Sequence, residues 1–210
     1  MKKSIILVSS ILIIIFNTSC NQKPAKKSLF GSRPNIILVI TDDEGKGDLS
    51  CLGNKVLQTP NIDSMYALST RFTDFHVSPM CAPTRAAIMS GTHEFRSGVT
   101  WTAKARENMA LSTTTIAEVL KEAGYETGIF GKWHLGDFNE YLPHNRGFIE
   151  EIVHGAGGVG QVMFGDFPGN CKNTYFDPYV MHNDIIVKTK GFCTDVFLQL
   201  TMEDQMAREN

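Results

Sequence analysis

The sequence lacks a strong charge of either sign. Its 210 residues carry 20 lysine and arginine residues against 22 aspartate and glutamate residues, which leaves a net charge of −2. No basic stripe is present, so nucleic acid is not expected as a partner. Internal repeats are also absent. With 42% apolar and 20% charged residues, the composition favours a packed core over disorder.

Long hydrophobic runs are scarce as well. Residues 5–16 are short for a membrane-spanning helix. Lys2 and Lys3 precede this run and small residues follow it, so residues 1–20 predict an export signal. Residues 18–20, Thr-Ser-Cys, resemble a bacterial lipobox in which Cys20 receives lipid, although Asn17 stands where an aliphatic residue is expected. Simple cleavage and an uncleaved anchor are the alternatives.

Residues 21–33 are rich in lysine, proline and serine, which predicts a solvated tether. Together with the export signal, the tether predicts an exported protein. We expect it to be periplasmic, or anchored to a bacterial membrane through a lipid on Cys20.

Cysteine is infrequent, with five residues in the chain. After Cys20 there remain Cys51, Cys81, Cys171 and Cys193. Their spacings form no metal-type pair, so the cysteines imply no zinc site. An even set would allow two disulfides in an exported protein. One of the four has another predicted role, described below, which leaves an odd number.

The order of apolar and polar segments predicts an α/β fold. Strands are expected at residues 35–40, 71–77 and 125–130, and helices at residues 60–68, 83–90 and 115–123. Beyond Gly147 the pattern weakens into glycine-rich loops. Asp42 and Asp43 follow the first strand, and Lys132 and His134 follow the last. Because ligands bind at the carboxyl ends of strands in open α/β sheets, the two clusters are expected to share one site.

The chemistry is concentrated at residues 81–85, Cys-Ala-Pro-Thr-Arg. We expect Cys81 to be the N-cap of a short helix, where free N–H groups and the helix dipole favour an anion. Arg85 follows one turn later on the same face and can hold an oxyanion. Taken alone, Cys81 could equally be a buried thiol or half of a disulfide.

Within a wider set of motifs, the chain is similar to the type I sulfatases. Cys-x-Pro-x-Arg is the modification signal of that family, and here the similarity continues to Gly91. Residues 34–43, 59–63 and 131–136 resemble three further blocks of the family, in the same order. This resemblance implies an alkaline-phosphatase-like α/β/α sandwich with a large mixed sheet. It also implies that residues 34–210 form the N-terminal part of the catalytic domain, incomplete in this chain.

The resemblance implies a sulfuric ester hydrolase acting on sulfated small molecules, sugars or glycans. A maturation enzyme would oxidise Cys81 to formylglycine, whose hydrate attacks sulfur and then expels sulfate by elimination. Asp42, Asp43 and the modified Cys81 would bind calcium, with magnesium as the other candidate.

The other roles also follow from the resemblance. Arg85 would orient the hydrated aldehyde, Lys132 would bind a sulfate oxygen, and His134 would help to deprotonate the second hydroxyl. Considered without the motifs, Asp42 and Asp43 would more often form a turn, and Lys132 and His134 would more often lie in a solvated loop. The remaining histidines are expected to be structural or to lie on the surface: His76, His93, His144, His154 and His182.

From Leu198 onward the sequence departs from the family's usual run, and the family's later metal and sulfate ligands have no matching positions. We therefore expect a truncation or frameshift near Leu198, and an isolated chain that folds poorly and turns over little. Two alternatives stay open: a phosphonate or phosphodiester hydrolase that uses the same modified cysteine, and a non-catalytic remnant.

Overall fold

The computed structural model describes residues 30–161 and 173–208. They fall into two units, one containing Glu44 and the residues before it, the other beginning at Gly45. The expected signal over residues 1–20 and most of the expected tether over residues 21–33 lie outside the described residues. Within the described ranges, every helix is too short or too polar to cross a membrane.

The apolar segment at residues 35–40 is not a strand. It has no regular secondary structure and no ladder pairing, and Ile37 and Val39 are 72% and 77% exposed. The expectation of a buried strand here was wrong. An apolar, β-branched run becomes a strand only when another segment pairs with its backbone groups, and the described residues of the first unit provide no such segment. Residues 71–77 are likewise exposed and irregular, not a strand.

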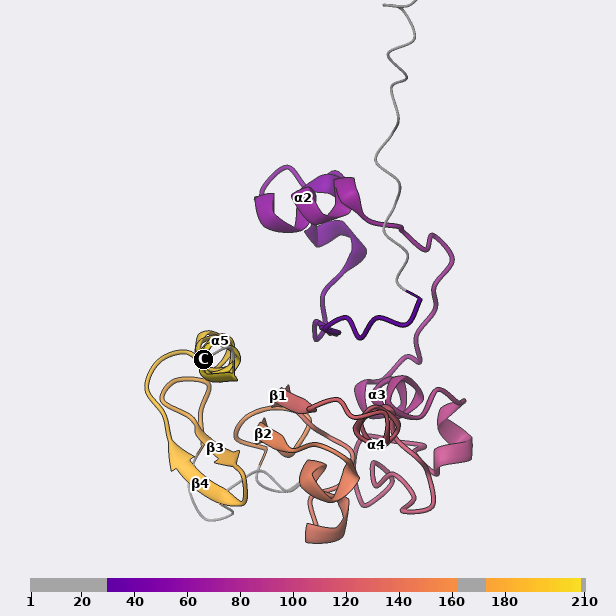
Figure 1. Cartoon of the computed structure of the whole chain (residues 1–210). Coiled ribbons are helices and arrows are strands. Elements are labelled where there is room, and N and C mark those ends of the chain that lie inside the picture. Colours follow the sequence, from indigo (N-terminus) through magenta and orange to yellow (C-terminus); the bar gives the residue numbers. More distant parts are fainter. Residues whose placement is uncertain (1–29, 162–172, 209–210) are drawn as a thin grey trace, which may run out of the picture. The chain divides into compact units, whose positions relative to one another are not determined.

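The second unit contains a mixed four-stranded sheet in the order β1-β2-β3-β4 (Figure 1). The strands are β1 (Gly128–Lys132), β2 (Glu150–His154), β3 (Tyr179–His182) and β4 (Ile185–Lys188). β1 and β2 are parallel, whereas β2–β3 and β3–β4 are antiparallel. The α/β expectation is confirmed. Three of the strands, however, lie beyond Gly147, where only loops were expected, because runs of four or five residues carry little periodicity.

The expected helices are present. They are α2 (Pro60–Leu68), α3 (Cys81–Ser90) and α4 (Ile116–Glu122), and α5 (Cys193–Arg208) follows the sheet. The capping box that the sequence predicted at α4 is formed: Thr115 Oγ1 accepts from Glu118 N at 3.1 Å, and a Glu118 carboxylate oxygen accepts from Thr115 N at 2.7 Å. Short 3-10 turns complete the unit: η1 (Lys46–Asp48), η2 (Ser50–Leu52), η3 (Glu94–Ser97), η4 (Asn139–Tyr141) and η5 (Pro143–Arg146).

One hydrophobic cluster joins α3 to the end of β1. Ala82, Ala86 and Met89 of α3 are buried together with Trp133 and Leu135, which follow β1. Trp133 has no exposed surface, and its indole N–H donates to the carbonyls of Gly136 and Tyr141. Trp133 is therefore a core residue, and the shared core holds the residues around Cys81 close to those around His134.

Asp63 of α2 secures the preceding turn. Its carboxylate accepts hydrogen bonds from Ser50 Oγ at 2.6 Å, Cys51 N at 3.0 Å and Thr59 Oγ1 at 2.9 Å. The bonds from Ser50, Thr59 and Cys51 stabilise the ionised carboxylate, so the pKa of Asp63 lies below its ordinary value. A single charged side chain thus connects η2 to α2.

This pKa shift predicts an acid-sensitive α2. Because the folded-state pKa of Asp63 is lowered, its contribution to stability is present above the ordinary aspartate pKa and is lost as pH falls through the folded-state pKa. We expect protection factors of the α2 amides in hydrogen exchange to fall over that acidic range. In Asp63→Asn they should be low already at neutral pH and nearly independent of pH. Asp74→Asn, at an exposed aspartate, is the control and should follow the unsubstituted protein.

Candidate active site

Cys81 is the first residue of α3 and Met80 occupies the N-cap position. The helix therefore begins two residues before the expected range 83–90, and the expectation that Cys81 is the N-cap was wrong. The Cys81 side chain is half-buried and its thiol is free. Cys51 and Cys193 are free as well, so no disulfide forms between the described cysteines. Cys171 lies outside the described residues. The Cys81 sulfur is therefore available for chemistry at the start of a helix.

The imidazole of His134 faces this thiol. His134 Nδ1 lies 3.4 Å from Cys81 Sγ, and His134 Nε2 lies 3.0 Å from the carbonyl oxygen of Thr102. Because a carbonyl oxygen can only accept, Nε2 carries the ring proton in that contact. In the neutral ring the lone pair of Nδ1 then points toward Cys81. His134 is thus oriented to accept a proton from whatever group stands at position 81.

The backbone holds His134 in an uncommon conformation. Its φ is +59°, in the left-handed region that non-glycine residues rarely occupy, and the residue is only 2% exposed. His134 N donates to the carbonyl of Gly155 at 2.9 Å, and Trp133 N donates to that of His154 at 3.1 Å. The pairing of β1 with β2 therefore continues past the ends of both strands and sets the position of the imidazole.

Glycine at position 157 leaves room for the imidazole. A Cβ atom added to Gly157 would lie 2.9 Å from His134 Cε1, closer than such atoms pack. The sequence indicated only a glycine-rich loop here, and the role of Gly157 and Thr102 beside His134 was missed. The run of glycines at residues 155–160 was the available signal, since glycine often marks close approach of a backbone to another group.

Arg85 connects α3 to the segment that carries His134. Its Nε donates to the carbonyl of Trp133 at 2.9 Å, and its Nη2 donates to the carbonyl of Lys132. Arg85 is 8% exposed. Its predicted role toward a hydrated aldehyde stays a prediction. The geometry shows a positioning role: the planar guanidinium binds two successive carbonyls at the end of β1. Lys132 is half-buried and is the last residue of β1.

Asp42 and Asp43 belong to the first unit. Both are exposed and lie in a bend after the extended segment, where Asp43 has a φ of +56°. The structure does not place them relative to Cys81. Of the predicted site residues, it brings together Cys81, Arg85, Lys132 and His134. The two adjacent carboxylates offer the hard oxygen donors that calcium and magnesium prefer.

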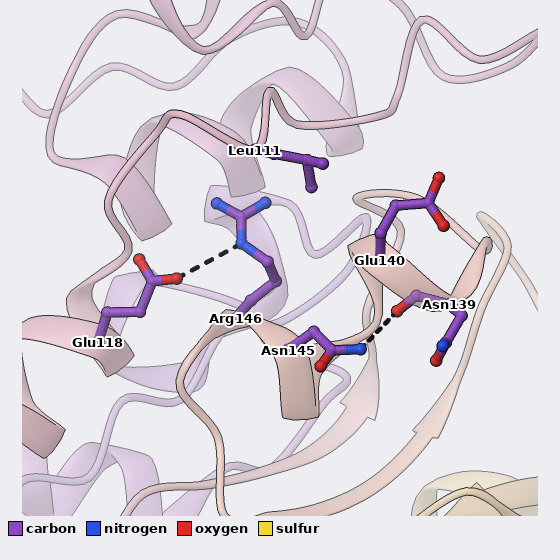
Figure 2. A pocket seen from close by; sticks show the side chains of 6 residues that line it. All are labelled: Leu111, Glu118, Asn139, Glu140, Asn145 and Arg146. Carbon is purple, nitrogen blue, oxygen red and sulfur yellow. Dashed lines mark hydrogen bonds and ion pairs between the residues drawn. The ribbon is translucent and has the colours of Figure 1, made fainter.

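A surface hollow beside α4 is a separate feature (Figure 2). It is lined by Leu111, Glu118, Asn139, Glu140, Asn145 and Arg146. The Arg146 guanidinium lies 3.6 Å from the Glu118 carboxylate and also donates to the carbonyls of Met109 and Thr113. These contacts hold the start of α4 in place. None of the predicted site residues lines this hollow.

Comparison with known proteins gives a consistent result. Residues 34–203 match the family described as Sulfatase. Human arylsulfatase G is 42% identical over 121 residues, which are 56% of this chain and 23% of the relative. The N-acetylgalactosamine-6-O-sulfatase of Bacteroides thetaiotaomicron is 39% identical over 150 residues, which are 65% of this chain and 29% of the relative. The chain thus spans less than a third of the length of these curated relatives.

Solved structures show the same fold. The crystal structure of Ps i-CgsB superposes with a TM-score of 0.71 and 28% identity, covering 84% of this chain and 42% of that one. The structure of BT4656 in complex with its substrate D-glucosamine-2-N,6-O-disulfate gives a TM-score of 0.64 and 28% identity, covering 81% and 31%. The expected alkaline-phosphatase-like fold, incomplete in this chain, is confirmed.

The double contact of Arg85 predicts that lysine cannot replace it. A lysine ammonium cannot span two successive carbonyls, so Arg85→Lys should leave a buried carbonyl unpaired. We expect the free energy of unfolding, measured in urea, to fall by about 1–3 kcal/mol. The matched substitution Arg96→Lys, at an exposed arginine of η3, should change it by less than about 0.5 kcal/mol. Equal stability of the two variants would contradict the positioning role.

Proposed function

The chain belongs to the sulfatase family, and from this premise we propose that the protein is a sulfuric ester hydrolase that acts through a formylglycine made from Cys81. The observation that carries the proposal is the contact between Cys81 Sγ and His134 Nδ1 at 3.4 Å. It joins the one cysteine that lies in a Cys-x-Pro-x-Arg sequence to a histidine that is buried and oriented by a second hydrogen bond.

Each residue of the site has a physical task in this proposal. When formed, the hydrated formylglycine supplies a nucleophilic oxygen and a second hydroxyl. His134 Nδ1 accepts the proton of a hydroxyl at position 81, while the Thr102 carbonyl holds the Nε2 proton and keeps the ring in that tautomer. Lys132 contributes positive charge toward the sulfate oxygens. Arg85 keeps the end of β1 against α3 and adds a second positive charge near the same place.

We assign the metal ligands to Asp42 and Asp43. Both are exposed carboxylates on neighbouring residues, and their mutual repulsion favours binding of a divalent cation. Their oxygen donors suit calcium, with magnesium as the other candidate. Bound at these residues, the cation would supply positive charge toward the reacting oxygens.

For the substrate we propose a sulfated sugar or glycan. One relative is named as an N-acetylgalactosamine-6-O-sulfatase, and one similar solved structure holds a disulfated glucosamine. We also propose that the protein is exported, because residues 1–20 have the layout of an export signal with Cys20 at the lipid-accepting position. A formylglycine-generating enzyme of the host is then a required partner.

The proposal predicts that Cys81 is modified in the mature protein. In a host that contains the maturation enzyme, the tryptic peptide spanning Cys81 should carry an aldehyde, detected by mass spectrometry after trapping with a hydrazide. Cys81→Ala should abolish trapping. Cys51→Ala is the matched control, because Cys51 is also a half-buried free thiol but lies outside the motif, and trapping should be unchanged. An unmodified thiol at position 81 in the native host would contradict the formylglycine mechanism and favour the non-catalytic alternative.

The proposal also predicts a kinetic role for His134. Turnover is measured with the complete protein, because this chain spans less than a third of its relatives' length. His134→Gln should retain the trapped aldehyde but lower kcat on an aryl sulfate by about 10²- to 10⁴-fold, the usual contribution of a positioned proton acceptor. His93→Gln, at a largely exposed histidine, should leave kcat unchanged. Faster hydrolysis of a phosphonate ester than of the sulfate ester would instead favour the phosphonate hydrolase alternative.

A further inference from the structure

A second group of metal-binding side chains lies outside the candidate active site. His144 of η5, Glu151 of β2 and Asp184 of the turn between β3 and β4 each offer one ligand atom, and these atoms all lie within 4.8 Å of one another. The residues come from three different elements, and none of them is a predicted calcium ligand. His144 was expected to be merely structural or superficial.

The contacts inside this cluster are close and directional. His144 Nδ1 lies 2.8 Å from Glu151 Oε1 and 3.3 Å from Asp184 Oδ1. The backbone N–H of His144 donates to the other Glu151 oxygen at 2.9 Å. One ring nitrogen thus faces two carboxylates from different elements.

The charge of the cluster is unbalanced. The Glu151 side chain is 1% exposed, and a buried carboxylate is costly unless a positive charge is nearby. Within the described residues, no lysine or arginine forms an ion pair with Glu151 or Asp184, and His144 is their shared partner. Two carboxylates against one imidazole leave an excess of negative charge even when the imidazole is protonated. A divalent cation would remove it.

The turn that carries Asp184 is already held in place. Asn183 and Asp184 have φ values of +46° and +66°, which is the two-residue hairpin turn of the I′ type. Asn183 N donates to the Glu151 carbonyl at 3.1 Å, and Glu151 N donates to Asn183 Oδ1 at 2.9 Å. The backbone beside Glu151 therefore fixes the turn, and the two carboxylates approach each other before any ion binds.

We propose that His144 Nδ1, one oxygen of Glu151 and one oxygen of Asp184 bind a divalent transition-metal ion, with zinc as the best match. In the metal-free chain the Nδ1 proton is donated to Glu151 Oε1, and it is released to solvent when the ion takes its place. An imidazole with two carboxylates favours zinc over calcium or magnesium, which prefer all-oxygen shells. In a tetrahedral zinc site with bonds of about 2.0–2.1 Å, ligand atoms are separated by about 3.3 Å. The distance of 3.3 Å between His144 Nδ1 and Asp184 Oδ1 already agrees with this value. The distance of 2.8 Å between His144 Nδ1 and Glu151 Oε1 has to increase slightly when the ion binds.

The bound ion would join η5, β2 and the β3–β4 turn and leave a fourth position for water. The ion would stabilise the fold, because it connects the β3–β4 hairpin to η5, the segment before β2. Zinc should therefore raise the thermal unfolding midpoint of the chain.

The test is a zinc titration of the metal-free 210-residue chain by isothermal calorimetry, with Asp184→Gly as the decisive variant. This substitution removes one ligand but produces an Asn-Gly turn, the preferred sequence for this hairpin, so the fold should be kept. We expect zinc binding to weaken by more than the roughly 10- to 100-fold that loss of an outer hydrogen-bond partner costs. The zinc-dependent rise of the unfolding midpoint should disappear, and His144→Ala should have the same effect.

Two controls define what would overturn the proposal. Asp177→Gly makes the same change at an exposed aspartate with a φ of +52°. His182→Gln disrupts a separate ion pair, in which His182 Nε2 lies 2.7 Å from Glu150 Oε1. Both should bind zinc like the unsubstituted chain. Zinc binding that survives Asp184→Gly and His144→Ala, or that is lost when the cysteines are alkylated, would place the ion elsewhere and refute the site. Displacement of zinc by equimolar calcium would also refute it.

Discussion

The hydrogen bonds from Arg85 to the carbonyls of Lys132 and Trp133 are the contact on which the candidate site depends. They connect the helix that begins with Cys81 to the end of the strand that leads to His134. A buried guanidinium has to satisfy its donors, and these backbone carbonyls provide acceptors in a fixed geometry. Arg85 therefore holds the start of α3 against the end of β1, where Cys81 Sγ lies 3.4 Å from His134 Nδ1.

The conformation of His134 follows from this connection. A left-handed backbone at a buried, non-glycine residue is unfavourable, and it persists because the neighbouring groups over-determine it. The Gly155 carbonyl accepts from its backbone N–H, the Thr102 carbonyl accepts from its ring, and Gly157 leaves space beside that ring. Orientation of a proton acceptor by fixed dipoles is how catalytic sites are commonly prepared before substrate arrives. A zinc ion bound by His144, Glu151 and Asp184 would stabilise the same sheet at the β3–β4 turn, away from His134.

Prediction from the sequence succeeded where the signal was local. The capping box at Thr115 and Glu118 was found because its side chains act within one turn, and the helix after Thr59 because Pro60 suits the first turn of a helix. It failed where a segment needs a distant partner. Residues 35–40 have the composition of a strand, yet their backbone groups are not paired in the described part of the chain. Strands β2 to β4 were missed because their stability comes from pairing with one another and with β1.

The sequence by itself determined the family, through the order of its motifs, and it singled out Cys81, Arg85, Lys132 and His134, because motif spacing along the chain is readable without coordinates. Only the tertiary structure decided what these residues contact. The tautomer of His134 depends on the Thr102 carbonyl, which lies 32 positions away. The meeting of His144, Glu151 and Asp184 depends on a turn that packs back onto β2. The contacts of Thr102 with His134 and of His144 with Asp184 join residues remote in sequence, and no local preference of the chain encodes them.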